Sequence, residues 1–168
     1  MKKHLPALVA GFGAGVLQVV PVVKSFSCLI IMPLAGFFAL VLYQKSNKII
    51  SPISTQKAVV TGLMTGVFAA LFGSFFEILI TFITKSNDLV YVVNDLYEFI
   101  DKFPVEETVK TQVIQLTENV VNSIKTTGFS LLYSFSVVVN NLIINPIFGT
   151  IGALIGLKFI NSKIQQNS

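Results

Sequence analysis

The stretch AVVTGLMTGVFAALFGSFFEILITFIT, residues 58–84, contains a single charged side chain, Glu77. As a helix it would extend about 40 Å at 1.5 Å per residue, which exceeds the hydrocarbon core of about 30 Å. Its glycines, Gly62, Gly66 and Gly73, fall with Glu77 on one helical face. Small residues on one face allow the backbones of neighbouring helices to approach closely in lipid. The stretch therefore predicts a membrane-spanning helix whose glycine face lies inside a bundle.

Three further stretches, residues 5–23, 26–43 and 127–160, are apolar enough to cross a bilayer. The run from 5 to 43 is too long for one crossing, so Pro21 marks a tight turn within it. Pro33 should kink the second helix, and Asn145-Pro146 offers a break in the last one.

The composition agrees with a membrane protein. Of the 168 residues, 53% are hydrophobic and 12% are charged, whereas about 25% charged residues are typical of soluble domains. Backbone polar groups in lipid are satisfied within helices or closed barrels, and these apolar runs are longer than barrel strands. We therefore expect an all-α fold, a single membrane domain over residues 1–168 built as a four-helix transmembrane bundle.

Small-residue stripes also mark the first and last helices. The helix-packing glycines expected there, in the manner of a glycine zipper, are Gly11, Gly15, Gly149, Gly152 and Gly156. Residues 11–16 and 62–67 both read Gly-x-x-x-Gly-Val at the start of a span, which we interpret as reused packing.

The segment between the last two spans differs from the rest. Residues 85–125 hold seven acidic residues and four lysines, a formal charge of −3, which leaves +7 for the remainder. Apolar residues recur there at helical spacing on both sides of Pro104. This pattern predicts an amphipathic helical hairpin over residues 87–125, outside the membrane, on its surface or docked over the mouth of the bundle.

Lysines in short loops predict the orientation. In a four-crossing arrangement one side receives Lys2, Lys3, Lys45, Lys48, Lys57, Lys158 and Lys163. Because lysine-rich short loops stay cytoplasmic, both termini are expected inside and the acidic insertion outside a bacterial inner membrane.

Glu77 and several amides are the candidate intramembrane polar residues. A carboxyl group in a span is a functional candidate because its ionised form is costly in hydrocarbon. One interpretation is a protonated Glu77 that hydrogen-bonds a neighbouring helix, and the other is a proton or cation site. The amides that could share such a site are Gln18, Asn140, Asn141 and Asn145. Alternatively, these amides form hydrogen bonds between neighbouring helices and have only a structural role.

Other chemistry has little support in the sequence. It lacks the motifs of hydrolases, zinc peptidases and phosphate-binding loops, and it contains no arginine. Cys28 and His4 are each the only residue of their type, so no metal site is expected. The scattered lysines argue against nucleic-acid binding. We expect a protein that is not an enzyme and has no cofactor.

One resemblance accompanies these features. The succession Ala10-Gly11, Gly15, Pro21, Cys28, Pro33, Gly36, Tyr43, Ala58, Gly62 and Gly66 resembles the opening of small bacterial four-helix membrane proteins, the domain-of-unknown-function family four-one-nine-nine. The resemblance implies four helices with a helical insertion before the last span, and it implies no activity or site residue.

Two functions remain open at this point. The first is a non-catalytic subunit packed through its glycine stripes, with membrane lipid, further copies of itself or other membrane subunits as partners. The second is a small channel or transporter that uses Glu77 and the helix break at Asn141 and Asn145-Pro146.

Overall fold

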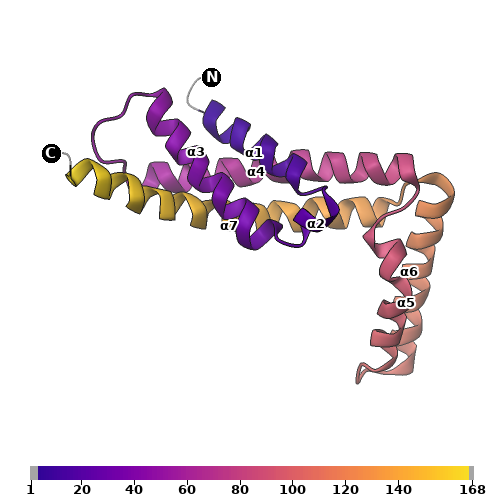
Figure 1. Ribbon diagram of the computed structural model, residues 1–168. Coiled ribbons are helices and arrows are strands. Elements are labelled where there is room, and N and C mark those ends of the chain that lie inside the picture. Colours follow the sequence, from indigo (N-terminus) through magenta and orange to yellow (C-terminus); the bar gives the residue numbers. More distant parts are fainter. Residues whose placement is uncertain (1–3, 167–168) are drawn as a thin grey trace. The chain divides into compact units, whose positions relative to one another are not determined.

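The computed structural model describes residues 4–166, and every regular element in that range is a helix (Figure 1). This result confirms the all-α prediction. The elements are α1 (Leu5–Leu17), α2 (Pro21–Lys24), the π-helix η1 (Ser27–Ile31), α3 (Met32–Ser46), α4 (Thr55–Thr84), α5 (Asp88–Asp101), α6 (Glu107–Thr127) and α7 (Leu131–Gln166).

Three helical segments are long and apolar enough to cross a membrane: Ser27–Ser46, Thr55–Thr84 and Leu131–Gln166. Such segments indicate a membrane protein, because about 20 apolar residues in helical form span the hydrocarbon core. The helix at Leu5–Leu17 is apolar but shorter.

The chain divides into two compact units. The first unit contains the described residues up to Phe76 and those from Val137 onward, and the second unit is Glu77–Ser136. The sequence divides its charge in the same way, because all eight acidic residues fall within residues 77–136. Residues 1–76 and 137–168 contain eight of the twelve lysines and no acidic residue.

The first helix ends earlier than expected. Instead of continuing to residue 23, α1 stops at Leu17, and Gln18 closes it through a backbone hydrogen bond to the Ala14 carbonyl oxygen. Val20 is extended, as is usual for a residue that precedes a proline, and Pro21 then begins the separate short helix α2. The thirteen residues of α1 rise only about 20 Å.

Pro33 acts differently from the simple kink that we expected. It occupies the first turn of α3, directly after η1, where the Met32 amide donates to the Ser27 carbonyl oxygen. A proline offers no amide hydrogen and crowds the carbonyl four residues earlier. The wider π-helical turn accommodates that loss without ending the span, which continues from Ser27 to Ser46.

The last helix also differs from the prediction of residues 127–160. Gly128 ends α6 with φ +78°, and α7 begins at Leu131 and reaches Gln166. Within α7 the helix continues through Pro146, so the expected break at Asn145-Pro146 is absent. The Thr150 hydroxyl donates to the Pro146 carbonyl oxygen at 2.7 Å, and this local bond supports the helix beyond the proline.

In the second unit, α5 and α6 follow the periodicity of the insertion closely. Asn87 caps α5 through its side chain, which accepts from the Val90 amide at 3.1 Å. Glu107 begins α6, as an acidic residue in a first helical turn should. The two helices run antiparallel and pack against each other (Figure 1), and their buried apolar residues are Val93, Ile100, Val120, Val121 and Ile124.

Polar contacts accompany this pairing. Lys110 donates to the Asp101 carbonyl oxygen and to the Glu107 carboxylate, both at 2.8 Å, across the connection between the helices. Lost hydration and the negative charge of Glu118 on α6 raise the pKa of the Tyr97 hydroxyl on α5. The interhelical apolar face and these polar contacts explain why the hairpin forms as a unit.

In the first unit, the end of α3, the start of α4 and the end of α7 meet around a small apolar cluster, composed of Leu40, Ile53, Ala58 and Ile160. Asn161 fixes the α3–α4 loop to α7 with two hydrogen bonds of 2.9 Å. Its carboxamide oxygen accepts from the Ile53 amide, and its nitrogen donates to the Ile53 carbonyl oxygen. The loop that precedes α4 is therefore held in place by α7.

Candidate functional site

Glycines bring the helices of the first unit into backbone contact. A Cβ atom at Gly62 would lie 2.6 Å from the Gly149 carbonyl oxygen, and one at Gly149 would lie 2.7 Å from the Gly62 carbonyl oxygen. One turn further along α4, a Cβ at Gly66 would overlap the backbone of Pro146. The contact between α4 and α7 therefore depends on the absence of side chains at these positions.

The remaining predicted glycines of the first unit make similar approaches. On α1, a Cβ at Gly11 would lie 2.7 Å from the Thr65 carbonyl oxygen, and one at Gly15 would lie 2.9 Å from the Gly73 amide nitrogen. On α7, Gly152 faces the backbone of Pro33, and Gly156 faces Phe37.

Sequence reasoning missed one glycine of this kind. A Cβ at Gly36 of α3 would overlap the backbone of Gly149, so four chain segments use glycine for their contacts. In the sequence, Gly36 is the single glycine of its predicted span and follows Pro33 by three residues. One glycine forms no stripe along a helical face, so no packing pattern pointed to it.

Two of the candidate amides meet inside the first unit. Asn145 of α7 is 3% exposed and donates to the side-chain oxygen of Gln18 at 3.1 Å. Gln18, at the end of α1, is 7% exposed, and its carboxamide nitrogen is buried with no hydrogen-bond partner in the structure. A Cβ at Gly73 would lie 2.8 Å from the Gln18 oxygen, so this glycine makes room for the amide.

Asn141 makes a second contact between helices. Its side-chain nitrogen donates to the hydroxyl of Ser74 at 3.0 Å, and Ser74 is 2% exposed on α4. Ser74 was missed from the sequence because serine is common on helices and its partner lies 67 positions away. The neighbouring Asn140 is exposed on the surface of α7, so the structure does not bring it to the buried amides.

Glu77 belongs to the second unit, whereas Gln18, Asn141 and Asn145 belong to the first. Its carboxyl oxygen accepts a hydrogen bond of 2.8 Å from the hydroxyl of Tyr133 on α7. Glu77 is half-buried. This contact joins α4 to the start of α7, and it leaves both interpretations of Glu77 open.

No group of three or more metal-ligating side chains occurs within residues 4–166. Among the same residues, the buried polar side chains mostly bond to each other or to helix carbonyls, as Thr61 and Thr65 do. The two threonine bonds lie within α4, whereas the Asn145–Gln18 and Asn141–Ser74 bonds join different helices.

These contacts define an all-helical membrane protein with backbone-close helix packing and interhelical amide bonds. Its sequence matches no protein-family model, no curated protein and no solved structure. The resemblance to the domain-of-unknown-function family thus stays a prediction.

Proposed function

We propose that the protein is a non-catalytic, multi-pass subunit of the bacterial cytoplasmic membrane that assembles with further copies of itself. Assembly as an accessory subunit with other membrane proteins is the wider form of this proposal. In support, most glycines of the first unit lie at close contacts between helices, and two side-chain hydrogen bonds, Asn141–Ser74 and Asn145–Gln18, join its helices.

The exposure of Asn140 is the observation on which the proposal rests. This asparagine is exposed on α7 and lies within the apolar sequence VVVNNLII, residues 137–144. An exposed amide at this place meets lipid, which offers no hydrogen-bond partner, unless another protein surface covers it. Asn141, one residue further, is oriented towards α4 and bonds to Ser74.

A second copy of the chain suits Asn140 better than an unrelated partner. A carboxamide contains both a donor and an acceptor, so two copies of one asparagine satisfy each other across a two-fold axis. Exposed apolar residues lie on the same face of α7, including Ile143 and Ile147, three and seven residues further along. These side chains provide the apolar surroundings in which an amide pair stabilises association.

The proposed topology places four helical segments in the bundle and both termini in the cytoplasm. Lys45, Lys48 and Lys57 occur around the end of α3 and the start of α4, and Lys163 follows near the end of α7, where Asn161 binds the α3–α4 loop. This distribution supports the cytoplasmic assignment of that end. Lys2 and Lys3 lie outside the described residues. The acidic pair α5–α6 is then placed on the outer side.

Native mass spectrometry of the full-length protein in mild detergent tests the proposal. We expect an oligomer whose mass is a multiple of 18.3 kDa. A stable complex with a different protein would support the accessory form and exclude self-assembly as the main role. A monomer that stays monomeric in lipid nanodiscs would contradict both forms.

A second candidate function is a channel or transporter for protons or small cations. The buried carboxamide nitrogen of Gln18, which has no partner in the structure, favours it, because an unsatisfied donor in a bundle is a place for water or a solute. In this alternative the Glu77 carboxylate binds the transported cation.

The substitution Glu77→Gln separates the two candidates. For a packing role we expect full stability, because the glutamine oxygen can accept the Tyr133 hydroxyl in the same way. We also expect no ion flux above protein-free vesicles in reconstituted liposomes, with or without the substitution. Flux through the wild-type protein that Glu77→Gln abolishes and Glu118→Gln, in α6, preserves would establish the transport function instead.

A further inference from the structure

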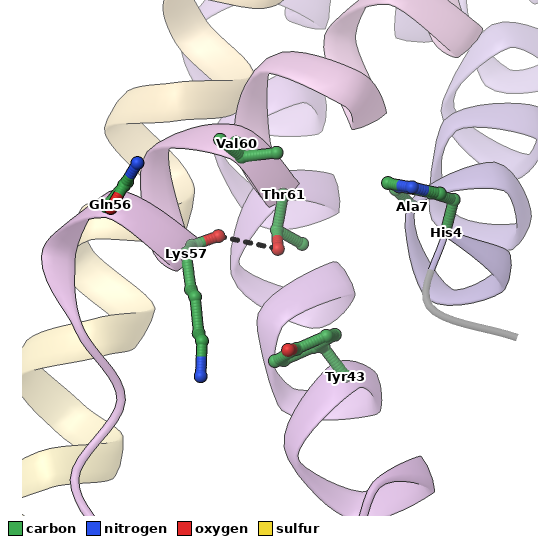
Figure 2. Close-up of a pocket in the computed structure, with 7 residues that line it drawn as sticks. All are labelled: His4, Ala7, Tyr43, Gln56, Lys57, Val60 and Thr61. Atoms are coloured by element: carbon green, nitrogen blue, oxygen red, sulfur yellow. Dashed lines mark hydrogen bonds between the residues drawn. The ribbon is translucent and has the colours of Figure 1, made fainter.

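A pocket of about 270 Å³, which we call the Lys57 pocket, lies in the first unit where α1 begins, α3 ends and α4 begins (Figure 2). Its volume is near the lower end of the range for small-ligand sites. Five of its seven lining residues are polar, and the full lining is His4, Ala7, Tyr43, Gln56, Lys57, Val60 and Thr61. Most of the accessible wall is nevertheless apolar, so the pocket can bind a small polar group only along part of its lining.

The donors of this pocket favour an anion. The Thr61 hydroxyl already donates to the Lys57 carbonyl oxygen at 2.7 Å. The Lys57 ammonium, the Tyr43 hydroxyl and the Gln56 amide are the groups that can donate to a ligand. Figure 2 shows Lys57, Tyr43 and His4, from three different segments, arranged around one opening.

A second pocket, of about 430 Å³, borders the same turns of α1 and α3. The apolar part of its wall is formed by Leu5, Pro6, Val9 and Leu42. The polar part is formed by Lys45, Ser46 and Asn47. Leu5 and Val9 are each 54% exposed. An apolar slot with a cationic rim matches a phospholipid, whose acyl chain and phosphate need these two environments.

The positive charge of the first unit favours a lipid with a negatively charged headgroup. Its sequence contains eight lysines and no acidic residue, so neither pocket is lined by a carboxylate. An anion that balances Lys45 and Lys57 must come from outside the unit. In the proposed topology these lysines face the cytoplasmic leaflet, whose anionic lipids attract basic residues near the membrane.

We propose that this end of the first unit is a binding site for anionic phospholipid. Lys57 and Tyr43 bind the phosphate of a headgroup in the Lys57 pocket, and Lys45 binds the phosphate of a lipid whose acyl chain occupies the slot beside α1. The assignment rests on the proposed membrane topology. It goes beyond general solvation by lipid, because it names the lysines whose charge favours a lipid of net negative charge over a zwitterionic one.

Native mass spectrometry with added lipid tests this site. We would titrate the full-length protein in mild detergent with phosphatidylglycerol and, separately, with phosphatidylcholine of the same acyl chains. Phosphatidylglycerol adducts should predominate, and Lys57→Gln or Lys45→Gln should each lower their occupancy about fivefold, the effect of one lysine at an anionic surface. The control Lys158→Gln removes an exposed charge of α7 that lines neither pocket and should leave the adducts unchanged.

Three outcomes would overturn the proposal: equal binding of the two lipids, equal loss in all three lysine variants, or full displacement by glycerol 1-phosphate, which would indicate a site for soluble anions. Unchanged thermal unfolding of each variant confirms that its fold is intact, and Tyr43→Phe provides a further variant without a charge change. The same spectra report the oligomeric state. Lost lipid selectivity in an intact oligomer would therefore reject this site without rejecting self-assembly.

Discussion

Replacing Gly66 with alanine should destabilise the protein by about 2 kcal/mol, the middle of the range for overpacked interiors. A Cβ at this position would overlap the backbone of Pro146 on α7, and backbone atoms have no rotamer through which to yield. Helices α4 and α7 would have to separate around this point, which also weakens the nearby contact between Gly62 and Gly149.

Gly13→Ala is the matched control for Gly66→Ala. No heavy atom lies within 4 Å of a Cβ built at Gly13 of α1. Alanine is the better helix former by about 1 kcal/mol, so this substitution should leave stability unchanged or raise it. Reversible unfolding in mixed micelles, with increasing dodecyl sulfate, measures both. Equal stability of the two variants would show that the glycine face does not determine the packing of α4 on α7.

Replacing Asn140 with leucine should weaken self-association about tenfold while preserving the fold of each chain. The side chain is exposed and accepts leucine without a steric clash inside the chain. Its loss removes the amide pair proposed across the contact, and interhelical amide bonds in membranes contribute roughly 1–2 kcal/mol in model peptides. A symmetric dimer should then dissociate at about tenfold higher protein concentration or more.

The control for this prediction is Asn140→Gln, which retains an amide on the same face of α7. It should keep most of the association in native mass spectra recorded over a range of protein concentrations. Association that survives Asn140→Leu undiminished would move the interface to another face of the molecule.

The periodicity of the sequence predicted helical structure on both sides of Pro104, where α5 and α6 lie, because the signals for these two helices are local. Asn87 and Glu107 mark helix starts by rules that act within one turn. The early end of α1 was harder to see, since residues 18–20 continue an apolar run without a charge or glycine. Only Pro21 indicated it, through its effect on the preceding residue.

The sequence predicted which residues contribute polar side chains to the site, but it did not predict which of them bond to each other. Gln18 and Asn145 were expected to be polar groups inside the bundle, yet their mutual hydrogen bond joins residues 127 positions apart. Asn140 and Asn141 differ by about 100° around the helix, and no sequence pattern indicates which of the two is buried. The structure orients one towards Ser74 and leaves the other exposed.

Pro146 shows how tertiary packing changes a local expectation. A proline in a helix removes a backbone hydrogen bond, and on that ground a break was expected. The backbone of Gly66 lies directly against Pro146, and the Thr150 hydroxyl bonds the proline carbonyl. Close packing and this bond allow α7 to continue, which is how prolines are tolerated in membrane helices.

Cysteine cross-linking at position 140 tests the central claim, that this face of α7 joins copies of the chain. In native membranes, and in a Cys28→Ser background that removes the only cysteine, Asn140→Cys should form a disulfide-linked dimer under mild oxidation. Disulfides require Cα atoms within about 7 Å, so buried Ser134, 8% exposed, provides the control variant Ser134→Cys, which should remain monomeric. Absence of the dimer for Asn140→Cys, or equal cross-linking of both variants, would contradict the account.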